Sequence, residues 1–507
     1  MVPQKKFFNA TVNALLLIPL FYVSSIAQIV NVASINTTYN TLSNSILIKQ
    51  QNNIFMNELT PWGFVQTNYS AETMLQSLNE KKGNGTTAGD ILKQQQQLAV
   101  QELNQPNQKQ IQTLQQNQLN GRQPEQNEQQ RQMKEFSALM FEVSSNTKKY
   151  SSTAYYQSVV YKNDFTNYIN AFNKLKDMLE GRTPLSIADA YYIEEAAYGN
   201  VPLSFEEYKN IIKQNTEFIR QWLKENKLNV NDPEVLHFGI QKFNSDTLVL
   251  NTAENLPRAH APYFYDYVNY NSDDNRTNYF ITKSLATGGG QCHTLPTNYL
   301  IIAESLGVDA NLAYSLSHSF IRYKNNMGTV QNYETTIDQL MPDQFYLETL
   351  PVMAKAKSNK IYISSLNKKQ IIASVMIDLA VNYVSEHWLY EKAFIQECMT
   401  TASAYFPNKE YFNDAYNYLN KLLYADAFNS KVQEKGIKDF SQIDKDPETL
   451  QAYNNLTDYM EKINSLGIQG FPESEYMRMM EYYDTKKKLQ KAKNINGKQQ
   501  RNLFFNQ

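Results

Sequence analysis

The chain has 507 residues, a formal net charge of −2 and two cysteines. This length has room for about two to four domains, and the near balance of 48 basic and 50 acidic residues argues against a nucleic-acid partner or an anionic membrane surface. Heavy use of tyrosine (35 residues), with modest glycine and proline, favours a predominantly helical protein.

The first 27 residues have the pattern of a secretory signal peptide. Lys5 and Lys6 precede an apolar run over residues 14–23, and Ser25 and Ala27 supply small residues where a signal peptidase reads them. The run is about ten residues long, short of the roughly twenty that span a membrane. We expect cleavage after Ala27, export to the periplasm or beyond, and no stable membrane insertion afterwards. An anchor formed by an uncleaved N-terminal helix is the alternative.

Polar segments follow. Residues 28–93 are rich in Asn, Thr and Ser and are expected to form an N-terminal helical segment. In residues 94–132, 17 of 39 positions are glutamine. Such a segment cannot bury enough apolar surface to build a core, so we interpret it as a linker or coil.

Residues 133–230 predict a helical subdomain. Ser186 opens a helix over residues 187–198, and Ser204 with Glu207 has capping-box spacing ahead of a helix over residues 208–223. Amphipathic patterns predict further helices over residues 136–143, 155–161 and 165–179.

The stretch from Gly288 to His293 precedes the next predicted helix. Prolines and an aromatic cluster predict loops and short segments over residues 231–278, and three glycines then lead into Cys292. An apolar run over residues 297–306, ended by Gly307, predicts a buried helix. The N–H groups and dipole at a helix start favour an anion, so a thiol there ionises more readily. Cys292 is therefore a candidate nucleophile.

Strand-like patterns follow and supply partners for the thiol. Strands are expected over residues 311–316, 318–323 and 330–335, with turn residues at 325–328 closing a hairpin that brings His318 beside Glu334. A catalytic thiol needs a base, and the base needs a third group to orient it. His318 fits the base and Glu334 the orienting carboxylate.

The neighbours of Cys292 allow other interpretations. Gln291 is a candidate for positioning an oxyanion, beside the backbone N–H groups of the helix start. His293 should turn away from the thiol, as a structural or substrate-lining residue. A zinc site from Cys292, His293 and His318 is the competing chemistry, but adjacent Cys and His seldom face one ion and a fourth ligand is missing. We therefore expect no metal and no cofactor.

Ordinary structural roles are the other alternative for these residues. Cys292, His318 and Glu334 could each be a core or surface residue without chemistry. Cys398 lies mid-helix and is interpreted as a small buried hydrophobe, with a bridge to Cys292 as the alternative.

The C-terminal third is helical in pattern. Helices are predicted over residues 368–388, 391–406 and 410–423, and small and aromatic positions within them hint at tetratricopeptide-like hairpins across residues 365–483. Residues 484–507 are rich in Lys, Asn and Gln and are expected to be a disordered polar tail.

Three motifs carry a family resemblance. Gly-Gln-Cys-His-x-x-Pro enters a helix at Gly290, His-Ser-Phe-Ile begins at His318, and Tyr-Glu-Thr-Thr begins at Tyr333. The chain resembles the transglutaminase-like branch of the papain-like cysteine enzymes. More narrowly, it resembles secreted Bacteroidetes proteins in which a transglutaminase-like core precedes tetratricopeptide-like helices. The resemblance covers about residues 231–423 and is most specific over 282–336.

The resemblance implies roles for three residues. Cys292 would be the nucleophile, His318 the base and Glu334 the orienting carboxylate, where the wider superfamily commonly has Asp. We therefore expect an α+β, predominantly helical protein with a papain/transglutaminase-like core over residues 231–364, between a helical N-terminal region and C-terminal helical hairpins.

The expected function is thiol acyl transfer on amide bonds of a protein or peptide substrate, with hydrolysis by a peptidase or amidase favoured over cross-linking because water is always available. The alternative is a catalytically inactive scaffold that binds a protein partner through its C-terminal helices.

Overall fold

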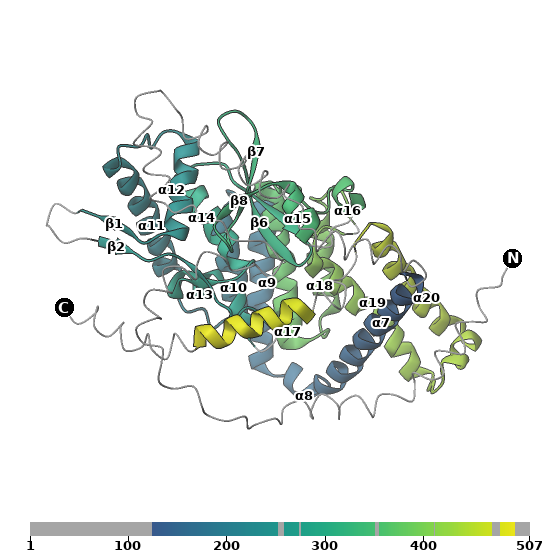
Figure 1. Cartoon of the computed structure of the whole chain (residues 1–507). Helices are drawn as coiled ribbons and strands as arrows, with labels where there is room; N and C mark the ends of the chain where they lie inside the picture. Colours follow the sequence, from purple (N-terminus) through teal and green to yellow (C-terminus); the bar gives the residue numbers. More distant parts are fainter. Residues whose placement is uncertain are drawn as a thin grey trace, which may run out of the picture.

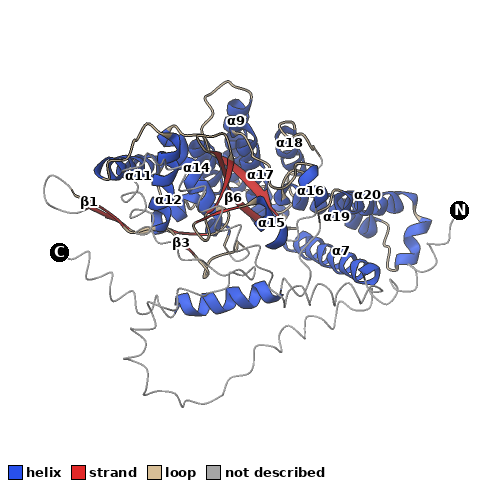
Figure 2. Cartoon of the chain, turned by 45° about the horizontal axis from the view of Figure 1, so that its top comes forward, coloured by secondary structure: helices blue, strands red, loops and turns tan. Residues whose placement is uncertain are grey.

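The computed structural model describes residues 124–251, 258–272, 275–349, 354–409, 411–468 and 477–491. The predicted signal peptide, the segment over residues 28–93 and most of the glutamine-rich segment lie outside the described residues. Helices make up 64% and strands 9% of the structure, which confirms an α+β, predominantly helical protein (Figures 1 and 2).

The N-terminal helices begin where capping residues predict. Ser186 accepts the N–H of Asp189, and Ser204 and Glu207 form the expected capping box. The first helix begins inside the predicted glutamine-rich segment. These helices are α7 (Pro124–Lys149), α8 (Thr153–Tyr156), α9 (Val159–Leu179), α10 (Ile187–Tyr198), α11 (Phe205–Glu225) and α12 (Pro233–Ser245).

Helix α12, with 13 residues, occupies part of a stretch for which the sequence predicted only loops and short segments, so the prediction was wrong for these residues. Pro233 is the first helical residue, where its missing N–H costs nothing and its fixed φ suits a helix, and the Asp232 side chain accepts the N–H of Glu234. The proline therefore starts a helix here and does not interrupt one.

The main sheet has four antiparallel strands in the order β5 (Asn311–Ser315), β6 (His318–Lys324), β7 (Val330–Glu334) and β8 (Gln339–Met341). The predicted hairpin between β6 and β7 is confirmed. Its turn is closed by the Gly328 N–H, which donates to the Asn325 carbonyl at 2.9 Å, and Gly328 takes a φ of 77°. Strand β8 was not predicted, because three residues are too short for an alternating pattern to stand out.

Two short strand pairs lie outside this sheet. Strands β1 (Leu248–Leu250) and β2 (Arg258–His260) pair antiparallel, and β3 (Phe264–Tyr265) pairs in parallel with β4 (Gly289–Gly290). The 3₁₀ helix η3 (Arg276–Tyr279) and α13 (Ile281–Thr287) lie between β3 and β4 in the sequence.

Helix α14 (Thr294–Leu306) is the centre of the fold. It packs on β5 and β6 on one side and on α11 and α12 on the other, as both views show (Figures 1 and 2). Its Tyr299 ring lies 5.4 Å from the Tyr333 ring of β7, and the Tyr299 hydroxyl lies 2.8 Å from His237 Nδ1 of α12. The helix is therefore held between the sheet and a helical layer.

The C-terminal helices pack in pairs and cover the N-terminal ones. Helix α17 packs against α18 and also against α9 and α10, whereas α19 packs against α20 and α7 (Figures 1 and 2). Their bounds are α15 (Asp343–Thr349), α16 (Ala354–Ser358), α17 (Lys368–His387), α18 (Lys392–Ser403), α19 (Asp414–Glu434), η4 (Phe440–Lys445) and α20 (Pro447–Ser465).

One cluster of buried side chains runs from Leu139 in α7 to Met460 in α20 and so crosses the predicted segment boundaries. Residues 477–491 form a further helix, which extends into the predicted polar tail. Within the described ranges, no helix combines the length and apolar character needed to cross a bilayer.

Candidate active site

The backbone before Cys292 depends on glycine at two positions. Gly288 ends α13 in the left-handed conformation with a φ of 75°. Gly290 has no room for a side chain, because an added Cβ would lie 2.9 Å from Ser284 Oγ and 3.0 Å from Leu295 Cδ2. The backbone therefore packs closely between α13 and α14, and this packing fixes the position of Cys292.

Cys292 lies in the turn just before α14. The helix starts at Thr294 and ends at Gly307 with a φ of 74°, which confirms the predicted helix and its terminator. The Cys292 side chain is half-buried, with Sγ 3.9 Å from the Ser317 carbonyl oxygen in the turn between β5 and β6. The Ser319 hydroxyl donates to the Cys292 carbonyl and so ties the turn to β6.

His318 is the first residue of β6 and lies between the thiol and a carboxylate. Its Nε2 is 2.7 Å from Glu334 Oε2. The Cys292 side chain lies close enough to the ring to raise the pKa of His318, and Nδ1 is the ring nitrogen that does not contact the carboxylate. The structure therefore brings Cys292, His318 and Glu334 together in the predicted order.

The strand register explains why the third residue is Glu. Ile321 lies opposite Tyr333, so one step further places Glu334 opposite Phe320 and not opposite His318. Diagonal neighbours on one face of a sheet are roughly 7–8 Å apart, a gap that a long side chain crosses more readily. The extra methylene of Glu lets its carboxylate reach His318.

Buried donors hold the Glu334 carboxylate in its charged form. Its Oε1 accepts the Thr336 N–H at 3.0 Å and the Thr336 hydroxyl at 2.6 Å, and its Oε2 accepts the Tyr346 hydroxyl at 3.3 Å. Burial acts to raise the pKa of Glu334, but His318 and the Thr336 donors outweigh it and lower the pKa below its ordinary value. Glu334 is therefore a carboxylate at neutral pH.

Glu334 and Cys292 together set the charge of His318. Burial alone would lower its pKa, but the Glu334 carboxylate and the Cys292 side chain outweigh burial and raise the pKa of His318 to about 10. The ring is therefore an imidazolium at neutral pH, with a side chain only 9% exposed. An imidazolium beside a cysteine favours the thiolate, which is the nucleophilic form.

No protein-family model, curated protein or solved structure matches the chain. The roles of Cys292, His318 and Glu334 therefore rest on the geometry above and on the motif resemblance. They stay predictions.

Gln291 is fully engaged in shaping the turn. Its Nε2 donates to the Asn278 carbonyl at 2.9 Å, and its Oε1 accepts the Thr294 N–H at 3.2 Å and the Thr294 hydroxyl. With both ends of the amide bonded, the side chain has a structural role in this conformation. The backbone N–H of Cys292 donates no hydrogen bond within the described residues, and it is the better placed oxyanion donor.

His293 packs among aromatic rings. Its ring stacks on Tyr279 with centroids 5.5 Å apart and meets the edge of Tyr191 at 6.0 Å. Burial, with the nearby Arg276 charge, lowers the pKa of His293 to about 3, so the ring is neutral at working pH. This placement suits the structural or substrate-lining role that the sequence suggested.

The second cysteine is separate from this site. Both cysteines are free thiols, and Cys398 is fully buried in α18, which confirms its interpretation as a small core residue. Burial raises the pKa of the Cys398 thiol well above its ordinary value. Among the described residues, no group of three or more His, Cys, Asp or Glu side chains could hold a metal ion.

Two further tyrosines near the site were not identified from the sequence. Tyr346 of α15 bonds Glu334, and Tyr265 of β3 lies close enough to Cys292 for the two to influence each other electrostatically. Tyr265 belongs to an aromatic cluster visible in the sequence, but only the parallel pairing of β3 with β4 places it beside the thiol.

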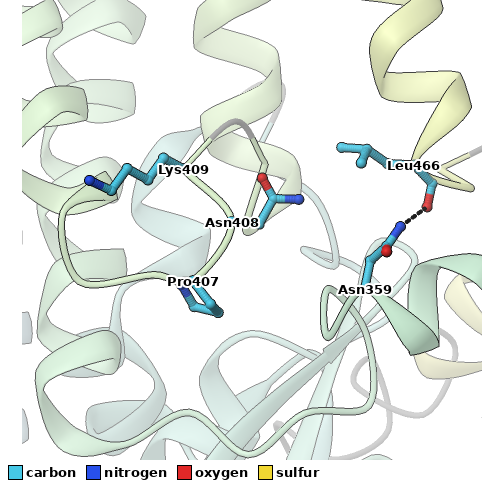
Figure 3. A pocket seen from close by; sticks show the side chains of 5 residues that line it. All are labelled: Asn359, Pro407, Asn408, Lys409 and Leu466. Atoms are coloured by element: carbon cyan, nitrogen blue, oxygen red, sulfur yellow. Dashed lines mark hydrogen bonds between the residues drawn. The ribbon is translucent and has the colours of Figure 1, made fainter.

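A separate hollow of about 470 Å³ lies at the C-terminal helices (Figure 3). It is lined by Asn359, Pro407, Asn408, Lys409 and Leu466, and the Asn359 side chain donates to the Leu466 carbonyl at 3.2 Å. These five residues contain no nucleophile paired with a base, so this hollow offers no comparable chemistry.

Proposed function

We propose that this chain is a cysteine enzyme that cleaves amide bonds by thiol acyl transfer, acting on a protein or peptide. One observation carries the proposal: the His318 ring is bonded to the buried Glu334 carboxylate and lies close enough to the Cys292 side chain for the two to interact. Each of the three could have an ordinary structural role alone. Together they form the nucleophile, base and orienting group that such chemistry requires.

The reaction proceeds in two steps. The Cys292 thiolate attacks the amide carbonyl and forms a carbon–sulfur bond, and the imidazolium of His318 gives its proton to the leaving nitrogen as the carbon–nitrogen bond breaks. Water then attacks the thioester, His318 takes a proton from it, and the carbon–sulfur bond breaks to release the acid. Glu334 keeps the ring oriented throughout, and the Cys292 N–H stabilises the oxyanion.

The finer fold assignment belongs to the same proposal. A cysteine before a central helix, packed on an antiparallel sheet that carries the histidine and the carboxylate, supports a papain/transglutaminase-like core. The paired helices α17–α18 and α19–α20 support tetratricopeptide-like hairpins. Export by a signal peptide cleaved after Ala27 completes the proposal and rests on the sequence.

A proteomic comparison tests this function. Extracts of extracellular proteins are incubated with the wild-type chain or with Cys292→Ala in water enriched in oxygen-18, and new peptide termini and cross-links are identified by mass spectrometry. Hydrolysis places the heavy isotope in new C-termini that depend on Cys292, whereas transfer to an amine yields cross-links. Products that are identical with both proteins would favour the inactive scaffold.

A further inference from the structure

The helix of residues 477–491 packs against a row of aromatic residues close to Cys292. We define the tyrosine strip as Tyr265, Tyr267 and Tyr270, which lie on and just after β3. The helix is the yellow one in Figure 1, and it lies at the outside of the chain in both views (Figures 1 and 2). Its position raises the question of what the helix covers.

Aromatic contacts hold the middle of the helix. The Tyr483 ring lies 4.7 Å from Tyr270, 6.0 Å from Tyr267 and, stacked, 6.2 Å from Tyr265. The Tyr482 hydroxyl lies 3.3 Å from the Tyr267 hydroxyl. Tyr483 therefore contacts all three members of the strip.

A side-chain amide anchors the C-terminal end of the helix. Gln490 Nε2 donates to the Tyr265 carbonyl at 3.0 Å, and its Oε1 accepts the Val268 N–H at 3.2 Å. Tyr483 and Gln490 lie about two turns apart on one face of the helix. The strip thus recognises an aromatic ring and an amide at a defined spacing.

A backbone hydrogen bond links the segment that carries the strip to the turn before Cys292. The Asp266 N–H donates to the Gly290 carbonyl at 2.7 Å, which fixes the strip beside the backbone that leads into Cys292. Burial raises the pKa of the Tyr265 and Tyr483 hydroxyls, and the charge of Cys292 adds to the rise in each. A side chain of the helix therefore reaches the surroundings of the candidate nucleophile.

We propose that the helix of residues 477–491 is an intramolecular cap that occupies the polypeptide-binding surface beside Cys292. This inference rests on the proposed function and deepens it. A substrate segment that presents an aromatic and an amide side chain about two helical turns apart competes for the strip and displaces the cap.

The exposure of the helix suits a displaceable element. Met477 and Leu489 are 54% and 51% exposed, so only one face of the helix is covered. Isolated helices shorter than about 12–15 residues are marginal in water, so a helix of this size depends on its contacts with the strip. Loss of the contacts with the strip therefore releases the helix from the surface beside Cys292.

The test uses the full chain and two alkylating reagents of different size. Tyr483→Ala removes the ring contacts, Gln490→Ala removes the amide anchor, and Leu489→Ala is the matched control on the exposed face. The rate of modification of Cys292 is measured by peptide mass spectrometry with iodoacetamide and with a maleimide that carries a polyethylene glycol chain. A synthetic peptide of residues 477–491 is then added to Tyr483→Ala.

We expect the bulky maleimide to react about tenfold faster in Tyr483→Ala and Gln490→Ala, with a smaller change for iodoacetamide and none in Leu489→Ala. The added peptide should slow the reaction again. Unchanged maleimide rates in both variants overturn the cap. The same rates measured in His318→Ala report on the proposed function separately, because an unchanged Cys292 rate in that variant counts against the proposed function and leaves the cap untouched.

Discussion

Replacing Glu334 with Gln tests whether the carboxylate keeps His318 in its charged state. Gln preserves the shape of the side chain, and its oxygen can still accept the bonds from Thr336, but it removes the charge 2.7 Å from His318 Nε2. The rise of the His318 pKa from 6.5 to about 10 corresponds to roughly 5 kcal/mol in favour of the imidazolium. Loss of the Glu334 charge therefore lowers the pKa of His318 toward its ordinary value.

The assay is the second-order rate of iodoacetamide alkylation of Cys292 at pH 6.5. Loss of the charge weakens the attraction that favours the imidazolium–thiolate pair, so we expect a rate on the order of tenfold lower in Glu334→Gln. The alkylation rate of buried Cys398, measured in the same samples, is the internal reference. Asp343→Asn is the matched control, because that carboxylate bonds Asn332 and Lys357 and not His318. An unchanged rate in a Glu334→Gln protein with a native melting temperature refutes the electrostatic reasoning.

Three further predictions concern the same site. First, the raised His318 pKa should keep the ring protonated from pH 7 to pH 9, so the ring-proton NMR signals of His318 should stay at their charged position there; a titration midpoint near 6.5 would show that Glu334 does not hold the charge. Second, Glu334→Asp shortens the reach to His318 and should lower the alkylation rate of Cys292 while the melting temperature stays nearly unchanged; equal rates in the variant and the wild type would contradict the diagonal placement of Glu334 and His318. Third, Gly290→Ala forces a Cβ against Ser284 and Leu295 and should cost about 1–3 kcal/mol of unfolding free energy, measured by urea denaturation; an unchanged midpoint would mean that the turn has room.

Local patterns were sufficient to predict the candidate site. A glycine run, a cysteine, an apolar helix and a hairpin lie within one short stretch, so residues that meet in space are also close in sequence. His318 and Glu334 are 16 residues apart and joined by a single tight turn. Periodicity and turn residues specify such neighbours because each depends only on nearby positions.

Long-range packing could not be predicted in this way. The Tyr418 hydroxyl of α19 bonds Glu142 of α7 across 276 positions, and Gln490 bonds Tyr265 across 225. Such contacts depend on complementary surfaces and leave no periodic signal in the chain. Helix α12 was missed for a different reason, since proline marks both helix starts and loops and only the Asp232 cap distinguishes them.

The most direct measurement for the central claim is the iodoacetamide alkylation rate of Cys292 in the wild-type chain and in His318→Ala at neutral pH. Our account predicts rapid alkylation of Cys292 in the wild type, with Cys398 unreactive, and a rate on the order of 100-fold lower once His318 is removed. Equally slow alkylation of both cysteines in the wild type, unaffected by His318→Ala, would contradict it.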